Sequence, residues 1–322
     1  MHYTQLGRSG LRVSRLCLGT MNFGTRTTEA DSREIMNSAL EEGINFFDTA
    51  NVYGRANGFG TTESIIGRWL AEDPSRRDKV VLATKVYGDV DGWPNHGRLS
   101  ALAIRSACDQ SLARLNTDHI DLYQMHHIDR QTPWEEIWEA FDVLHQQGKV
   151  IYVGSSNFAG WNVAQAQETA RQRHMLGLVS EQALYNLLER RNELELIPAL
   201  MEYGLGLIPW SPLAGGLLGG TQAPGADARR SSPSAQELLA KHKAELDRYE
   251  QLCQAFGEPP GRVALAWLLA KPWVTAPIVG PRTLPQLKDA LTALSLTLED
   301  SQLAQLEEIF PPAGTAPEAY AW

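Results

Sequence analysis

The chain has 322 residues, of which 43% are hydrophobic and 21% charged, and its formal net charge at pH 7 is −9. These proportions exclude a disordered chain, and the acidic balance argues against a nucleic-acid partner. Its cysteines, Cys17, Cys108 and Cys253, are far apart and form no CxxC pair, which argues against a zinc ribbon or a redox motif.

The beginning of the chain and its apolar runs bear on location. Residues 1–15 are polar and lack the apolar core of a signal peptide, and the longest apolar stretch, residues 263–270, is too short to span a bilayer. We therefore expect a cytoplasmic protein without a membrane partner.

Short apolar runs alternate with amphipathic stretches along almost the whole chain. The apolar runs predict strands at residues 16–19, 45–49, 80–86, 120–126, 150–155, 178–183, 206–210 and 276–279. The amphipathic stretches predict helices at residues 31–42, 62–71, 100–115, 133–147, 161–173, 192–202, 236–256, 261–269 and 284–294. Asp31 is a suitable N-cap for the first of these helices.

Strands that are separated by helices pair in parallel, and eight such units in a row predict a closed (β/α)8 TIM barrel. We expect residues 1–322 to form this barrel as a single domain, with an N-terminal β-hairpin and extra C-terminal helices. The alternative is an open, doubly wound sheet. That fold would be favoured by a G-x-G-x-x-G motif after the first strand, but residues 18–24 read Leu-Gly-Thr-Met-Asn-Phe-Gly.

Two segments lie outside the repeat. Residues 1–14 hold two short alternating runs around a glycine-containing turn, which predicts a hairpin that could cover the bottom of the barrel. Residues 214–234 are rich in Gly, Ala, Pro and Ser and predict a long loop. This loop is either a lid over a ligand or a disordered insertion.

Unusual polar residues stand at the ends of consecutive predicted strands. Asp48 ends the second strand, Lys85 the third and His126 the fourth, and Tyr53 follows Asp48 in the loop. Alternation along a strand places Asp48, Lys85 and His126 on one face, where they would converge if that face is the barrel interior. An Asp48–Lys85 ion pair would offset the cost of burying each charge. The ammonium would lower the pKa of a nearby phenol, which makes Tyr53 a candidate general acid.

Each of these residues also has a plain structural explanation. Asp48 could cap a turn, Lys85 could reach the surface, Tyr53 could pack, and His126 could be a buried histidine with satisfied hydrogen bonds. A metal site is the other alternative, since His126, His127 and Asp129 are close in sequence. Successive strand side chains point to opposite faces, which argues against both imidazoles binding one ion.

The order of these motifs resembles the aldo-keto reductase family, in particular bacterial-type NADPH-dependent members, over essentially the whole chain. The resemblance rests on motifs at successive strand ends, namely 6–14 (LGRSGLRVS), 18–20 (LGT), 42–50 (EGINFFDTA), 53–54 (YG) with Glu63, 84–85 (TK), 121–126 (DLYQMH), 154–158 (GSSNF), 210–213 (WSPL) and 279–283 (VGPRT). It implies a TIM barrel that reduces an aldehyde or ketone to the alcohol with NADPH.

The same resemblance implies roles for individual residues. Tyr53 would protonate the carbonyl oxygen, Lys85 would lower the phenol pKa, Asp48 would hold the lysine, and His126 would orient the carbonyl. Cofactor contacts are implied for Thr20, Met21, Ser156, Asn157, Gln182, Trp210, Ser211, Pro212, Leu213, Gly215, Leu217, Gly280, Arg282, Gln286 and Asp289. A preference for NADPH over NADH is expected mainly from Arg282, because guanidinium suits phosphate.

Substrate contacts are expected from the loops after the strands. The candidates are Asn22, Phe23, Val52, Tyr87, Trp93 and His127, which would form a pocket for a small-molecule carbonyl compound. Two positions depart from the family pattern. Ala290 follows Asp289 where relatives often carry an asparagine, which would weaken adenine contacts, and His127 stands beside the expected catalytic histidine.

Two further functions are possible for the same barrel. It could be a cofactor-binding redox sensor or a channel-associated subunit that turns over slowly, or a metal-dependent hydrolase. A burst of NADPH oxidation without steady turnover would indicate the sensor, and loss of activity with a chelator would indicate the hydrolase.

Overall fold

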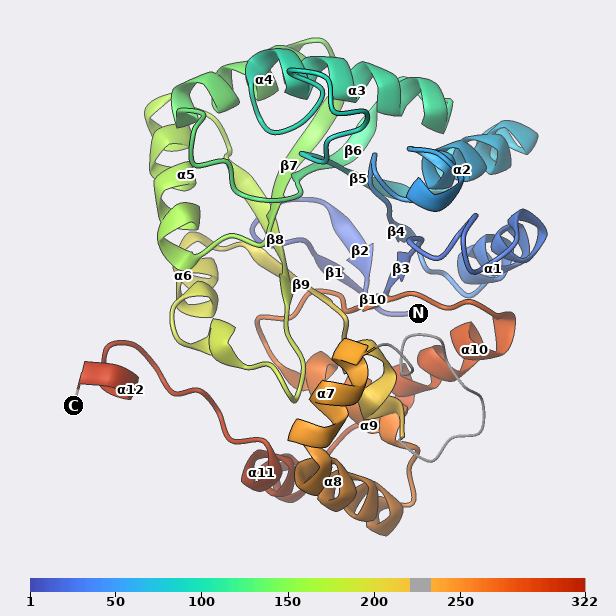
Figure 1. The fold of residues 1–322 in the computed structure, drawn as a ribbon, viewed down its shortest axis with the longest axis vertical. Helices are drawn as coiled ribbons and strands as arrows, with labels where there is room; N and C mark the ends of the chain where they lie inside the picture. Colours follow the sequence, from blue (N-terminus) through green and yellow to red (C-terminus); the bar gives the residue numbers. More distant parts are fainter. Residues whose placement is uncertain (221–232, 322) are drawn as a thin grey trace.

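A computed structural model of the chain describes residues 1–220 and 233–321. Parallel strands occupy its centre and helices surround them (Figure 1). The strands are β3 (Cys17–Gly19), β4 (Phe46–Asp48), β5 (Val81–Val86), β6 (Ile120–Met125), β7 (Val150–Ser156), β8 (Leu178–Leu184), β9 (Gly206–Trp210) and β10 (Ile278–Val279). This arrangement confirms the predicted (β/α)8 TIM barrel.

The strands follow one another around the barrel in chain order, and β10 returns to pair with β3. The seam between β9 and the segment before β10 is closed at Leu207. Its amide donates to the carbonyl of Trp273 at 3.3 Å, and its carbonyl accepts from the amide of Thr275 at 2.9 Å. Parallel pairing places every carboxyl end at the same mouth, which is where the predicted polar residues lie.

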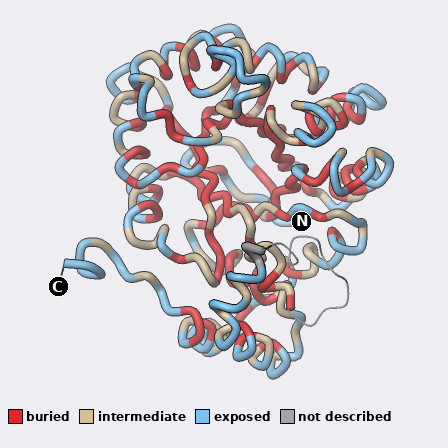
Figure 2. The backbone as a smooth tube through the Cα atoms, in the orientation of Figure 1, coloured by how far each residue is buried: buried red, intermediate tan, exposed pale blue. Residues whose placement is uncertain are grey.

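Helices surround the strands, and most of them bury an apolar face; α12 has no buried residue. They are α1 (Glu29–Glu41), α2 (Thr61–Glu72), α3 (Ala101–Leu115), α4 (Trp134–Gln146), α5 (Gly160–Gln172), α6 (Leu196–Tyr203), α7 (Pro233–Lys241), α8 (Lys243–Phe256), α9 (Pro260–Ala270), α10 (Leu284–Thr292), α11 (Asp300–Ile309) and α12 (Glu318–Ala321). Short 3-10 helices are η1 (Arg55–Asn57), η2 (Pro74–Lys79), η3 (Arg191–Glu193), η4 (Ala214–Gly219) and η5 (Ala293–Ser295). Buried residues gather in the strands and on the inner faces of the helices (Figure 2).

Three details of the predicted helices are wrong. Thr28, not Asp31, caps α1, because the Thr28 hydroxyl accepts the Asp31 amide at 3.2 Å. The helix predicted over 236–256 is divided at His242 into α7 and α8. The helix predicted from residue 192 begins at Leu196, after a 3-10 turn.

The N-terminal hairpin is present as predicted. Strand β1 (Tyr3–Gln5) pairs antiparallel with β2 (Arg12–Ser14). Leu6 and Val13 of this hairpin are fully buried in one cluster with Phe46, Leu122 and Val179 from inside the barrel. The hairpin therefore fills the lower end of the barrel with apolar side chains, while the opposite mouth stays available for polar ones.

The predicted loop over 214–234 lies mostly outside the described residues. Its first part is η4, in which Gly215 and Gly216 adopt positive φ values of 67° and 103°. No helix among residues 1–220 and 233–321 combines the length and apolar character that crossing a bilayer requires.

Candidate active site

A buried lysine joins an aspartate and a tyrosine at the mouth of the barrel. Lys85 on β5 donates to Asp48 Oδ1 at 2.6 Å, to the carbonyl of Thr49 at 2.8 Å and to the hydroxyl oxygen of Tyr53 at 3.1 Å. These bonds use the three donors of the ammonium. The structure thus brings together the three groups that the sequence placed on neighbouring strand ends, and Lys85 is fully buried instead of reaching the surface.

Two glutamines complete the surroundings of Asp48. Gln124 on β6 and Gln182 on β8 each donate a side-chain amide to Asp48 Oδ2, at 3.0 and 2.8 Å. The sequence argument assigned no role to Gln124, although it shares the inward face with His126, and assigned Gln182 only to the cofactor. The contact between Gln124 and Asp48 could have been predicted, because strand alternation places the Gln124 amide inside the barrel.

Burial and charge act against each other in this group. Burial by itself would lower the pKa of Lys85, but the Asp48 carboxylate and the Tyr53 phenol outweigh it, and the pKa lies above the ordinary value. Burial raises the pKa of Tyr53, and the Lys85 ammonium opposes that rise only in part. The predicted effect of Lys85 on the phenol pKa is therefore present, but the expected net acidity is wrong because burial outweighs it: Tyr53 is held protonated, with a cation beside its oxygen.

His126 lies against Tyr53 on the other side. Their rings meet edge to face with centroids 5.8 Å apart. Burial lowers the pKa of His126 to about 3, with further contributions from Lys85 and His127, so the imidazole is neutral near pH 7. A neutral imidazole can donate one hydrogen bond to a carbonyl oxygen without releasing its proton.

His127 points away from this group. It is exposed, its ring lies 5.3 Å from that of Tyr87, and its Nδ1 is 2.9 Å from the carbonyl oxygen of Ile128. Within the described ranges, no three His, Cys, Asp or Glu side chains are grouped to hold a metal ion. The two imidazoles thus point in different directions, as the alternation of side chains along a strand predicts.

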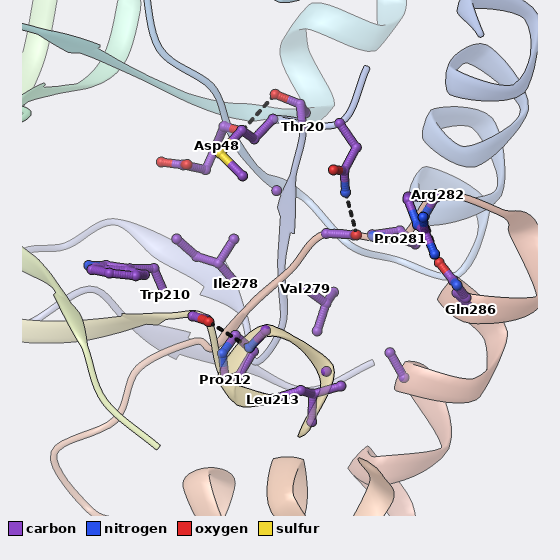
Figure 3. A pocket seen from close by; sticks show the side chains of 18 of the residues that line it. Thr20, Asp48, Trp210, Pro212, Leu213, Ile278, Val279, Pro281, Arg282 and Gln286 are labelled. Atoms are coloured by element: carbon purple, nitrogen blue, oxygen red, sulfur yellow. Dashed lines mark hydrogen bonds between the residues drawn. The ribbon is translucent and has the colours of Figure 1, made fainter. Parts of the chain in front are cut away.

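A cleft of about 630 Å³ extends from the Tyr53 group across the mouth of the barrel. Asp48 and Trp210 lie at one end, and Arg282 and Gln286 lie at the other (Figure 3). Most of the predicted cofactor residues line it, namely Thr20, Met21, Ser156, Asn157, Gln182, Trp210, Ser211, Pro212, Leu213, Gly215, Gly280, Arg282, Gln286 and Asp289.

The end of the cleft near Tyr53 is shaped by Asn157 and Trp210. The Trp210 indole N–H donates to Asn157 Oδ1 at 3.1 Å, and Asn157 Nδ2 donates to the carbonyl of His126 at 3.1 Å. Ser156 donates to the carbonyl of Gln182 at 2.8 Å. A flat indole face and several amide groups therefore stand close to the phenol, as recognition of a flat ring that carries a carboxamide requires.

The far end of the cleft has features that suit phosphate. A Cβ on Gly215 would meet no atom within 4 Å, so the backbone there faces open space. Gln286 accepts the Arg282 amide at 2.8 Å, and Asn22 donates to the carbonyl of Gly280 at 2.8 Å. Asn22, expected to contact substrate, lines the cleft and also braces the segment that precedes Arg282.

Several predicted contacts lie elsewhere. Leu217 is buried in the core and does not line the cleft. Phe23 is fully buried among the residues beneath α1 and α2. Tyr87 packs against His127, Val52 contacts the loop at Gly88, and Trp93 is 68% exposed, so none of the three lines the cleft.

Sequence reasoning missed the wall formed by α9. Pro259, Gly261 and Leu265 line the cleft opposite the predicted phosphate residues, and so do Ile278 and Val279. The pair Pro259–Pro260 marks the start of a helix. That signal could have pointed to α9, because helix N-termini favour anions.

Comparison with known proteins identifies the family of the chain. Residues 15–310 match the aldo/keto reductase family. Over the full length of both chains, the sequence is 55% identical to a Bacillus subtilis protein named uncharacterized oxidoreductase YrpG.

Two more distant relatives have names that indicate different functions. Versiconal hemiacetal acetate reductase of Aspergillus parasiticus is 33% identical, over 98% of this chain and 99% of its own length. A probable voltage-gated potassium channel subunit beta of rice (Oryza sativa subsp. japonica) is 32% identical, over 92% of each chain. The chain therefore belongs to the aldo/keto reductase family of oxidoreductases.

Proposed function

We propose that the chain is an NADPH-dependent reductase of aldehydes or ketones, in which Tyr53 donates the proton. The observation that carries this proposal is the ammonium of Lys85, which lies 3.1 Å from the Tyr53 oxygen and 2.6 Å from Asp48. No simple structural role requires a fully buried lysine to share its donors between a carboxylate and a phenol.

The cofactor would supply a hydride from its nicotinamide ring. Ser156, Asn157 and Gln182 would hold the carboxamide of that ring, and Trp210 would lie along its face. Gly215, Gly280, Arg282, Gln286 and Asp289 would hold the phosphate and adenosine end. A guanidinium at this end favours a cofactor with a 2′-phosphate.

The chain's own groups would manage the proton. Tyr53 remains a phenol because burial raises its pKa, so it can give a proton to the carbonyl oxygen as negative charge develops there. Lys85 already donates to the phenol oxygen, and this contact strengthens as that oxygen becomes negative. Asp48, held by two glutamines, fixes the ammonium in place. Neutral His126 would donate to the carbonyl oxygen and orient it.

The substrate is proposed to be a small carbonyl compound. It would enter at the mouth beside His126, where Trp210 and Met21 line the cleft and the Tyr87–His127 pair stands at the rim. We propose a cytoplasmic location and a single catalytic domain for the chain.

The test is NADPH oxidation with a panel of carbonyl compounds, from glyceraldehyde and methylglyoxal to nitrobenzaldehyde and ketosugars. We expect steady turnover of at least one of them, and loss of turnover in Tyr53→Phe with the Kd for NADPH nearly unchanged. A Tyr53→Phe variant with near-normal kcat would refute the acid role. A single burst of NADPH oxidation without turnover of any compound would favour the sensor function instead.

A further inference from the structure

A buried carboxyl group without a cationic partner lies directly behind the cleft. Glu181 on β8 is fully buried and faces the helices, whereas its neighbour Gln182 faces the barrel interior and contacts Asp48. Among residues 1–220 and 233–321, no lysine, arginine or histidine forms an ion pair with Glu181. Burying a carboxyl in this way is costly, so its contacts need an explanation.

Glu181 holds both ends of one turn. Its Oε1 accepts the backbone amide of Phe158 at 2.9 Å, and its Oε2 accepts the hydroxyl of Ser155. The two bonded residues flank Ser156 and Asn157, the pair that lines the cleft. One carboxyl group thus fixes the entry and the exit of a turn whose front side faces the proposed cofactor.

The turn needs such support because its backbone is unusual. Asn157 has a φ of 61°, in the left-handed region that asparagine tolerates better than most residues. On the side of the cleft, the Asn157 side chain is bonded to the Trp210 indole, the His126 carbonyl and the Ser156 hydroxyl. Behind the turn, the Asn157 backbone amide donates to the Gln182 carbonyl at 3.1 Å, and the Glu181 carboxyl adds anchors at Ser155 and Phe158.

We propose that Glu181 is a positioning residue that sets the cofactor affinity of the chain through the turn 155–158. This inference rests on the proposed function, since it takes the ligand of Ser156 and Asn157 to be a nicotinamide carboxamide. Glu181 would not touch the cofactor. A shift of the turn away from β8 would misplace the amide of Asn157 and weaken binding without disturbing Tyr53, Lys85 or Asp48.

The chain offers a conservative variant and a matched control. In Glu181→Gln, the amide oxygen can still accept from Phe158, and the Ser155 hydroxyl can accept from the new amide while donating to the Ser180 carbonyl, which is 3.4 Å away. Gln167 is a buried residue that makes two bonds to the backbone of Leu178, at the opposite end of the same strand. Gln167→Leu therefore removes comparable contacts far from the cleft.

The experiment measures the Kd for NADPH by fluorescence titration, and the Tm, for the parent chain, Glu181→Leu, Glu181→Gln and Gln167→Leu. We expect the Kd to rise about tenfold in Glu181→Leu and to stay within about threefold of the parent in Glu181→Gln, since an unsatisfied buried amide costs a factor of this order. Gln167→Leu should lower the Tm and leave the Kd unchanged.

A Kd for Glu181→Leu within about twofold of the parent overturns the positioning role, and so does an equal rise of the Kd in Gln167→Leu. If Glu181→Leu fails to fold, Ser155→Ala removes one anchor only and should raise the Kd about threefold, and an unchanged Kd overturns the proposal. The experiment also distinguishes failure of this inference from failure of the proposed function. A parent chain that binds NADPH but reduces no carbonyl refutes the reductase alone, whereas a parent that binds no nicotinamide cofactor refutes both.

Discussion

The two ends of the barrel differ sharply although the same strands build them. Near the strand starts, Phe46 and Leu122 pack with Leu6 of the hairpin in an apolar cluster. Two residues further along, Asp48 and Gln124 belong to a buried polar network around an ammonium. Two residues along each strand thus separate a layer that stabilises the fold from a layer proposed to move a proton. Mutations in the first layer should mainly change stability, and mutations in the second should mainly change kcat.

The largest effect is expected at the polar end. Lys85→Met removes the charge beside the Tyr53 oxygen and leaves Asp48 buried without its ion-pair partner, so kcat should fall by about 10²- to 10⁴-fold. Steady-state kinetics with the best carbonyl from the panel measure this. Lys271→Met, which breaks an ion pair with Glu307 away from the cleft, is the control and should keep its kcat. A Lys85→Met variant within tenfold of the parent would show that the ammonium has no role in proton transfer.

The apolar end should show the opposite pattern. Leu6→Ala leaves a cavity in the layer that closes the barrel, so the free energy of unfolding should fall by about 2–5 kcal/mol while kcat of the folded protein stays within about twofold. Urea denaturation and kinetics at a temperature below the transition measure the two quantities. Leu11→Ala, at a partly exposed position of the same hairpin, should cost less. A loss of kcat in folded Leu6→Ala would contradict the separation of the two ends.

A smaller effect is expected at the far end of the cleft. Arg282→Ala removes the guanidinium proposed to bind the 2′-phosphate, so the KM for NADPH should rise about tenfold while the KM for NADH stays unchanged. Arg68→Ala, on the exposed face of α2, controls for the loss of a surface charge. An equal rise of both KM values would place Arg282 outside the phosphate site.

The smallest effect concerns pH and again belongs to the polar end. The pKa of His126 is lowered to about 3 in the folded chain, whereas the ordinary value is 6.5. Between these values the unfolded chain binds more protons, so the contribution of His126 to stability is present above pH 6.5 and is lost as the pH falls toward 3. The free energy of unfolding, measured from pH 4 to 7, should fall less steeply toward acid pH in His126→Gln than in the parent. Identical slopes would mean that the imidazole is not desolvated.

Much of the barrel could be predicted from the sequence because its strands are short apolar runs separated by amphipathic helices. The convergence of Asp48, Lys85 and His126 followed from strand alternation alone. Tyr53 lies in a loop, where no periodicity applies; its position just after Asp48 made it a candidate, and the family resemblance implied its role as the acid.

Other features depend on distances that a sequence does not contain. The direction of the Tyr53 pKa is set by competition between burial and one charge, and the sign of that balance depends on how completely the phenol is enclosed. Leu217 was assigned to the cleft by the family resemblance, but its side chain is buried in the core. The anchor at Glu181 lies on the outward face of a strand, where burial depends on the helix packed above it.

The Asp48 carboxylate has a consequence beyond catalysis. It accepts hydrogen bonds from Lys85 on β5, Gln124 on β6 and Gln182 on β8. These bonds connect β4 with three other strands of the barrel. All four of these side chains belong to strands and not to surface loops. Loops other than the one that carries Tyr53 can therefore change, together with the compounds they admit, while the lysine beside the proposed proton donor keeps its place.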